Sequence, residues 1–361
     1  MGKGGRLTIR SADFGKDPYS YYKSLRRQGG IHFLPDENVW LVVKYDLASS
    51  ILRQPAVFSS SPFAVLSPSF HGADAPDHTV MRRFLNPFFT PERQQAQRES
   101  IARHIARIIA RIETVKTFDA VADLAIPIPF SVACSWLGLR EDIAAEIHRH
   151  PASGIEWADV VPALLSDGII PELVAEGSLP KKQIAELASF FIAASYGSSR
   201  DLLLLGLSVL MENPEVVARV NADMSLMPVL VEEILRLEPS AHTLLRRTRS
   251  EVEIGGQKIP EGSMIWVSLG AANRDPEVFD DPDELKLDRV STRHLAFGIG
   301  PHFCIGSPMA RLENEMILTR LMPLIPRLRP TGPMDIGFWD DFPGNVPSSR
   351  QIRSWPMVLA R

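Results

Sequence analysis

One run of ten residues, Phe-Gly-Ile-Gly-Pro-His-Phe-Cys-Ile-Gly at positions 297–306, carries more structural information than any other part of the chain. Its three glycines permit a tight loop whose backbone can lie close under a flat ligand. The helical pattern that follows, from Ser307 to about Met322, puts the sulfur of Cys304 near a helix N-terminus. That end of a helix favours negative charge and lowers the pKa of a thiol, so a ligating thiolate is predicted here.

The spacing of this run, Phe-x-x-Gly-x-x-x-Cys-x-Gly, resembles the haem-ligand signature of the cytochrome P450 family at every defining position. A haem iron held by a thiolate needs an ionised cysteine that is shielded from water and faced by backbone N–H groups. The resemblance therefore implies haem b, iron protoporphyrin IX, with the thiolate of Cys304 as the axial ligand of the metal. A buried structural cysteine in a glycine-rich turn is the alternative. The loop residues that the resemblance places against the haem are Phe297, Gly298, His302 and Gly306.

Haem carries two propionates, so its site needs several donors along one edge. The segment Asp-Ala-Pro-Asp-His-Thr-Val-Met-Arg is similar to the part of the family that supplies a His and an Arg four residues apart, here His78 and Arg82. Arg246, expected just before the strand 252–254, aligns with a third donor, and His302 with a fourth. Each of these residues alone would be interpreted as surface charge. Together with Cys304 they predict a cofactor site.

A further family pattern is the buried ion network behind the haem. Glu233-Ile234-Leu235-Arg236 is similar to the Glu-x-x-Arg helix motif of the family. The spacing of three residues puts Glu233 and Arg236 on one helical face, where they can pair. By itself such a pair is usually a solvated one. The downstream segment 273–276 resembles the partner segment, so Arg289 is expected to complete the network.

The central helix, expected from residue 180 to about 211, departs from the family pattern. Typical members carry an acid and an alcohol here, which deliver protons during oxygen activation. The alignment puts Ser195 at the groove glycine, Gly197 at the acid and Ser198 at the alcohol. These are the candidate catalytic positions, and the carboxylate is absent from them. Arg200-Asp201 is either a self-satisfied ion pair or a pair that positions a substrate charge.

The expected fold class is mainly α with small β-sheets, as one cytochrome P450 domain over residues 1–361. Between 140 and 179 the chain is too short for the two long helices that form the family's lid. We therefore expect an open distal pocket for a bulky or carrier-bound substrate, or closure by a partner protein or a dimer. Helical patterns lie at 19–27, 90–112, 117–149, 180–212 and 226–238, and β-rich runs at 39–43, 251–254 and 264–269.

Composition limits the setting of this chemistry. The formal net charge of the 361 residues is -4, which argues against an extended nucleic-acid surface. The two cysteines, Cys134 and Cys304, cannot form a disulfide framework, which suits a reducing compartment. No signal-peptide pattern follows Met1, and no segment approaches the roughly 20 apolar residues of a membrane span. We expect a cytoplasmic protein with neither nucleic acid nor membrane as partner, and Cys134 as a core residue.

Three functions fit these observations. The first is a P450-type monooxygenase, or a related oxidative enzyme of natural-product metabolism, with a ferredoxin-type electron donor. The second is a P450-like auxiliary protein that stabilises a partner enzyme, and the third is a haem enzyme with peroxide-driven or non-oxygenase chemistry. Arg103, Arg107 and Arg111 recur every four residues, as a solvated basic face or as a docking patch for an acidic ferredoxin.

Overall fold

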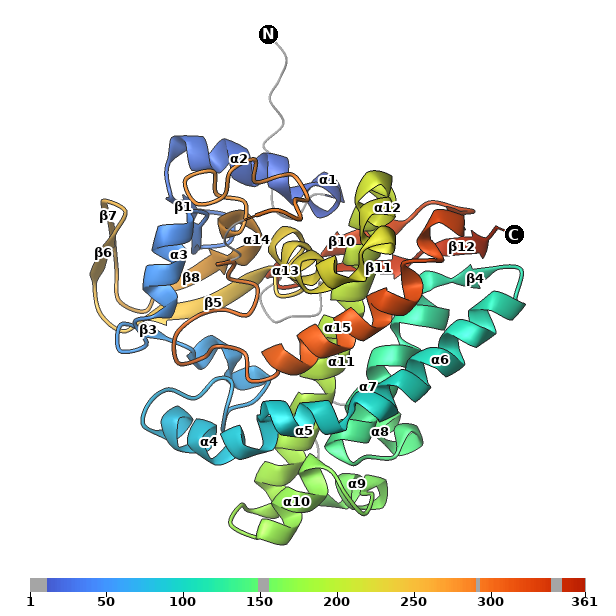
Figure 1. Ribbon diagram of the computed structural model, residues 1–361. Helices are drawn as coiled ribbons and strands as arrows, with labels where there is room; N and C mark the ends of the chain where they lie inside the picture. The colour runs from blue at the N-terminus through green and yellow to red at the C-terminus, as the bar shows by residue number, and fades with distance from the viewer. Residues whose placement is uncertain (1–11, 149–155, 290–292, 339–345, 361) are drawn as a thin grey trace.

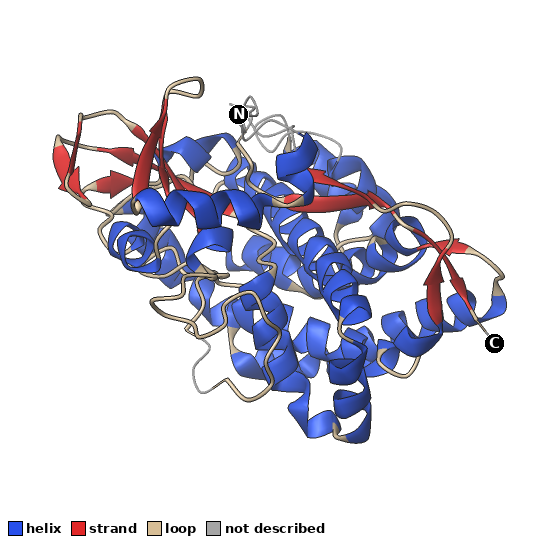
Figure 2. Cartoon of the chain, turned by 90° about the horizontal axis from the view of Figure 1, so that it is seen from above, coloured by secondary structure: helices blue, strands red, loops and turns tan. Residues whose placement is uncertain are grey.

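The structure is a computed structural model that describes residues 12–148, 156–289, 293–338 and 346–360. Helices make up most of these ranges, and the strands gather along one side of the molecule (Figure 2). The α-helices are α1 (Ala12–Lys16), α2 (Pro18–Gln28), α3 (Tyr45–Leu52), α4 (Asp77–Leu85), α5 (Pro91–Ala96), α6 (Arg98–Thr114), α7 (Pro127–Leu137), α8 (Glu141–His148), α9 (Trp157–Val160), α10 (Ile169–Glu176), α11 (Lys181–Glu212), α12 (Pro214–Ala222), α13 (Met227–Leu237), α14 (Leu269–Ala272) and α15 (Ser307–Leu321).

Short helical turns of other kinds join several of these helices. They are η1 (Ser61–Val65), η2 (Asn86–Phe89), the π-helical η3 (Ala120–Ala125), η5 (Val161–Ala163), η6 (Met224–Leu226) and η7 (Ile325–Arg327). The strands are β1 (Ile31–Leu34), β2 (Val39–Val42), β3 (Phe58–Ser59), β4 (Phe118–Asp119), β5 (Thr243–Thr248), β6 (Val252–Ile254), β7 (Gln257–Ile259), β8 (Met264–Ser268), β9 (Leu328–Pro330), β10 (Asp335–Phe338), β11 (Arg350–Ser354) and β12 (Pro356–Leu359).

The long helix α11 runs through the middle of the molecule (Figure 1). Its later turns are apolar on all sides, and the run Leu202–Leu205 is buried. A helix that is hydrophobic all round has to lie inside the fold, and α11 packs against α7, α13 and α15. Gly206 lets α13 approach closely, since a Cβ there would lie 2.9 Å from Cγ2 of Ile234. This packing fixes the turns of α11 that contain Ser195 and Ser198.

The largest sheet has the strand order β1-β2-β8-β5-β3. Strand β2 pairs with β8 in parallel, and the other neighbours are antiparallel. Both faces of β8 are buried, with Trp266 in one apolar cluster and Ile265 and Val267 in another. The sheet positions Arg246, which precedes β6 as expected and lies inside β5, a strand that was not predicted.

Most predicted helices and strands are present, with two corrections. The pattern at 90–112 is two helices, α5 and α6, separated at Gln97. The pattern at 117–149 begins with β4 and the π-helical turn η3, and α7 starts only at Pro127. Pro127 and Pro129 have no N–H to donate to the preceding turn, and the helical backbone changes at this point from the π-helical turn η3 to α7.

The expectation that no segment approaches a membrane span was wrong. Ala120–Leu137 has 18 residues with a mean hydropathy of 1.6, which is long and apolar enough to cross a membrane by length and composition. However, 67% of this stretch is buried inside the fold, as in the core helix of a globular protein. Its apolar side chains contact the central helix α11, so packing accounts for the composition.

Between α7 and α11, the described residues 138–148 and 156–180 contain only short helices. They are α8, α9 with the turn η5, and α10, and α9 and α10 both pack against α11. Gly138 ends α7 in the left-handed region at φ +74°, and Gly168 (φ +119°) lies directly against it. The shortened helix and the helical remnant expected here correspond to α10 and to α9 with η5.

Candidate haem site

The Cys304 loop folds back on itself in the way that the sequence predicts. Gly298 and Gly300 adopt positive φ of +66° and +83°, a region that disfavours other residues. A Cβ on Gly300 would also lie 2.6 Å from the Leu52 carbonyl oxygen, so no side chain fits there. The backbone N–H of Cys304 donates to the Phe297 carbonyl at 3.0 Å and closes the loop. The result is a tight turn that holds the sulfur before the first turn of α15.

The electrostatics of the sulfur differ from the expectation. Burial raises the pKa of Cys304, and the backbone N–H groups of Gly306 and Ser307 and the charges of Arg82 and Arg311 offset only part of that rise. The helix terminus therefore does not lower the pKa on balance, because desolvation is the larger effect. A desolvated sulfur faced by N–H groups suits a thiolate whose compensating charge is a metal ion.

Four predicted donors come together beside this loop. The rings of His78 and His302 stack with centroids 3.8 Å apart, and Nη1 of Arg82 donates to the Phe303 carbonyl oxygen at 2.7 Å. Arg246 is only 4% exposed, and burial lowers its pKa to about 10. Burial, and then the neighbouring His78, Arg246 and other cationic groups, lower the pKa of His302 to about 2. Two arginine side chains and two imidazoles that can donate hydrogen bonds along one edge fit an anionic partner, as haem propionates would be.

The nearby acid Asp74 offsets only part of the lowered pKa of Arg246, because its charge raises that pKa against the larger effect of burial. Asp74 is paired with Arg249 at 2.5 Å and accepts hydrogen bonds from the Ser59 hydroxyl and the Ser60 backbone N–H. Arg246 makes its hydrogen bond to the carbonyl of the preceding residue, Leu245, at 2.7 Å. The residues present therefore fit the implied group: a thiol below, and hydrogen-bond donors along one edge.

The three candidate catalytic residues lie on one partly uncovered face of α11. Ser198 is exposed and Ser195 and Gly197 are half-buried, in a helix whose neighbouring turns are mostly buried. A Cβ on Gly197 would meet no atom within 4 Å, so this face is open. The hydroxyls of Ser195 and Ser198 donate to the carbonyls of Phe191 and Ala194, one turn earlier. Both hydroxyl protons are thus directed into the helix.

A carboxyl group that the sequence analysis missed lies behind this face. Glu313 on α15 is 3% exposed, and its Oε2 accepts a hydrogen bond from the Ser199 hydroxyl at 2.8 Å. Its Oε1 is buried without a hydrogen-bond partner among the described residues, and burial raises its pKa to about 7. The signal was available, because Met309 and Ile317 flank Glu313 at i−4 and i+4 and are both buried. An acid inside an apolar helical face is a candidate for chemistry.

Arg200 and Asp201 form the self-satisfied ion pair that was one of the two interpretations. Their side chains are 2.6 Å apart, and Asp201 also accepts from the Ser349 hydroxyl at 2.7 Å. Burial raises the pKa of Asp201 to about 6, against the effect of Arg200. The Arg200 guanidinium lies over the ring of Tyr196, 5.7 Å from its centroid. The pair joins the central helix to the C-terminal part of the chain.

The predicted ion network is formed. Glu233 is fully buried and accepts from Arg236 at 2.8 Å, from Arg289 at 3.0 Å and from the Lys286 backbone N–H at 3.1 Å. Arg236 also donates to the backbone carbonyls of three residues in the following segment, which ties this segment to α13. These bonds lower the pKa of Glu233 although burial alone would raise it.

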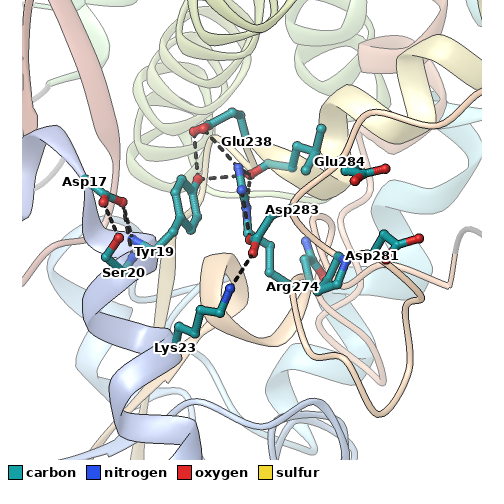
Figure 3. Close-up of polar contacts among 12 residues, drawn as sticks. Asp17, Tyr19, Ser20, Lys23, Glu238, Arg274, Asp281, Asp283 and Glu284 are labelled. Carbon is teal, nitrogen blue, oxygen red and sulfur yellow. Dashed lines mark hydrogen bonds and ion pairs between the residues drawn. The ribbon is translucent and has the colours of Figure 1, made fainter.

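A second network adjoins the first and was not predicted (Figure 3). Glu238 accepts from the Tyr19 hydroxyl at 2.7 Å and from Arg274 at 3.3 Å, and Arg350 binds it at 2.9 Å. Asp283 pairs with Arg274 and, more weakly, with Lys23. This second network joins α2, the end of α13 and the strand β11, and it holds these elements together.

The cysteine loop is also clamped from α13. Arg311 on α15 donates two hydrogen bonds to Glu232, at 2.6 and 3.0 Å, and its guanidinium lies 4.6 Å from the ring centroid of Phe297. His294 shares the same carboxylate at 3.2 Å. The residue spacing did not predict this cluster, because its members come from three separate segments.

Two further predictions concern residues outside the site. Cys134 is 1% exposed, and burial raises its pKa to about 12, as expected of a core thiol. Arg103, Arg107 and Arg111 are exposed, and they pair with Glu99, Glu141 and Asp123 at 2.7, 3.9 and 3.1 Å. The stripe is therefore a solvated face with local acidic partners.

The loop, the edge of hydrogen-bond donors and the open face of α11 together define a haem-thiolate type of site. The family model for cytochrome P450 matches residues 167–323. The chain is 30% identical over 371 residues to 6-deoxyerythronolide B hydroxylase of Saccharopolyspora erythraea, with 89% of this chain and 91% of the relative covered. It is also 30% identical to cytochrome P450 monooxygenase PikC of Streptomyces venezuelae, with 88% and 86% covered.

Solved structures show the same fold. Testosterone-bound CYP109E1 of Bacillus megaterium superposes with a TM-score of 0.84 at 23% identity, over 97% of this chain and all of that chain. Cytochrome P450epoK bound to epothilone D also gives a TM-score of 0.84, at 22% identity, over 99% of this chain and all of that one. The chain belongs to the cytochrome P450 family.

Proposed function

We propose that the protein is a haem-thiolate monooxygenase that oxidises a natural-product-like small molecule in the cytoplasm. The observation that carries this proposal is the convergence of Cys304, the N–H groups behind it and four hydrogen-bond donors, two of them arginines, on one site next to an open face of the central helix. When bound there, haem b would supply oxygen activation with electrons from a ferredoxin-type donor. The named activities of the relatives, hydroxylation and monooxygenation, support the same reaction type.

Each residue of the site has a separate role in binding the haem. Cys304 would hold the iron, while His78, Arg82, Arg246 and His302 would bind the propionates and fix the macrocycle. The aromatic ring of Phe297, with Gly298 and Gly306, would keep the loop flat beneath it. Arg311, through Glu232, keeps that loop in place.

The proton supply differs from the usual arrangement. Gly197 offers no acid, so we assign the acid role to Glu313, which reaches α11 through Ser199. A carboxyl group with a pKa of about 7 can hold and release a proton near neutral pH, which is what general acid catalysis requires. Ser198, adjacent in the chain, would supply the hydroxyl nearest the open face, and the small residues Ser195 and Gly197 would leave room on it.

The short region between 140 and 179 sets the kind of substrate. With α9, η5 and α10 in place of long lid helices, the distal side suits a bulky substrate. From Trp157 to Pro180 the chain has the acidic residues Asp159, Asp167, Glu172 and Glu176 and no Lys or Arg. This negative charge would repel an acidic carrier protein, so it favours a free substrate. The test below also shows whether a partner protein, or a second copy of this chain, covers the distal side.

The test uses the haem-loaded protein with a ferredoxin, a ferredoxin reductase and NADPH. Testosterone, epothilone D and 6-deoxyerythronolide B are the probes, and isotopically labelled dioxygen is the oxidant. We expect a product that contains one labelled oxygen atom, and labelled peroxide in place of the donor system would separate a peroxide-driven enzyme. The proposal would be contradicted if NADPH is oxidised but no substrate gives a product with any oxidant. A partner protein that is bound in stoichiometric amount would then favour an auxiliary role.

A further inference from the structure

His71 lies in the loop that leads from η1 to the edge of hydrogen-bond donors, above the open face of α11. Its ring is stacked on Phe63 of η1 with centroids 4.3 Å apart. The ring centroid of Phe190 of α11 is 5.3 Å from that of His71. Phe190 precedes Ala194 and Ser198 by four and eight residues, so the three share one face of the helix. The imidazole is therefore part of the wall beside the candidate catalytic residues.

The Nδ1 of His71 is buried and has no hydrogen-bond partner among the described residues. Burial lowers the pKa of His71 to about 3, and the positive charges of Arg246 and His78 act in the same direction. The ring is neutral at physiological pH, so one nitrogen donates and the other accepts. A buried ring nitrogen without a partner is rare in native proteins and points to a ligand.

The loop holds this ring in a fixed place. Glu186 of α11 accepts from the hydroxyl of Ser67 at 2.7 Å and from the hydroxyl and backbone N–H of Ser69 at 2.8 and 3.1 Å. The N–H of Gly72 donates to the Ser67 carbonyl at 2.8 Å. A Cβ on Gly72 would lie 2.2 Å from the backbone nitrogen of Ala64, so only glycine allows the loop to close. His71 is thus positioned before any substrate arrives.

We propose that His71 is a specificity-determining residue that hydrogen-bonds an uncharged polar group of the substrate, a hydroxyl or an amide. The inference rests on the proposed function. The neutral ring of His71 can donate to and accept from a neutral polar group, and Arg82, Arg246, His78 and His302 are already assigned to the propionates of the haem. The flanking Phe63 and Phe190 imply that the group is carried on an apolar skeleton, which those rings would contact.

The experiment uses the haem-loaded protein and matched pairs of 1-alkylimidazoles and 1-(ω-hydroxyalkyl)imidazoles in a graded series of chain lengths. The azole nitrogen anchors each probe on the iron, so one chain length brings the hydroxyl to His71. In the unmodified protein the hydroxyl member should bind at least as tightly as its alkyl partner at that length. In His71→Phe it should bind about tenfold more weakly than its partner, since one hydrogen bond is lost. His104→Phe, on α6, is the matched control.

Three results would overturn the inference. The first is that the hydroxyl probe binds more weakly than its alkyl partner at every chain length in the unmodified protein. The second is that the hydroxyl probe still binds as tightly as its alkyl partner in His71→Phe. The third is faster haem loss from His71→Phe with the azole ratios unchanged, which would assign the ring to the haem edge. Failure of the proposed function itself is distinct, because the unmodified protein would then give no thiolate-type Soret band with carbon monoxide.

Discussion

Replacement of Glu313 by Gln tests whether the folded protein raises the pKa of this carboxyl group. Glu313 is 3% exposed, and burial raises its pKa from 4.5 to about 7, so the folded protein binds this proton more tightly than the unfolded chain does. The free energy of unfolding should therefore fall as the pH rises from about 4.5 to about 7. At about 1.4 kcal/mol per pKa unit, the loss is about 3 kcal/mol across that window. Glu313→Gln keeps the hydrogen bond from Ser199 and should lack this loss.

The assay is urea denaturation followed by circular dichroism at a series of pH values from 5 to 8, on haem-loaded protein. The difference in unfolding free energy between Glu313→Gln and the unmodified protein should move in favour of the variant by about 3 kcal/mol as the pH rises. Glu315→Gln removes a carboxylate from the same helix and serves as the reference. Parallel curves for the unmodified protein and Glu313→Gln would refute the raised pKa, and with it the assignment of Glu313 as the proton donor.

Three further changes probe the packing and the cofactor edge. Glu233→Gln leaves Arg236 buried without its counter-charge, so the urea midpoint should drop by the equivalent of about 3–5 kcal/mol, and an unchanged midpoint would contradict the network. Gly206→Ala brings a methyl group against Ile234 and should cost about 1–3 kcal/mol in the same assay, where a neutral result would mean that α11 and α13 are not tightly packed. Arg82→Ala should speed haem transfer to apomyoglobin, and an unaltered rate would remove Arg82 from the propionate site.

Much of the fold could be predicted because its signals are local. The period of apolar residues from Lys181 to Glu212 marks one long buried helix, and glycines that need positive φ mark the Cys304 loop. The break at Gln97 could not be predicted, because no residue there disfavours a helix and tertiary packing decides it. The strand β5 was not predicted for a related reason, since Arg246 and Arg247 interrupt its apolar pattern.

The candidate site was predictable where a spacing encodes it and hidden where distant segments meet. His78 and Arg82 are one helical turn apart, so their proximity follows from the sequence. The contact of Ser199 with Glu313 depends on how α15 crosses α11, and no local pattern contains that information. The direction of the Cys304 pKa was mispredicted because a helix terminus is visible in the sequence, whereas the desolvation of a sulfur is a property of the folded chain.

The most direct measurement is the absorption spectrum of the reduced, haem-loaded protein under carbon monoxide, for the unmodified chain, Cys304→Ser and Cys134→Ser. The account predicts a thiolate-type Soret band in the unmodified protein and in Cys134→Ser, and its loss in Cys304→Ser. A band that persists in Cys304→Ser, or that is missing from the unmodified protein, would contradict the claim that Cys304 holds the iron.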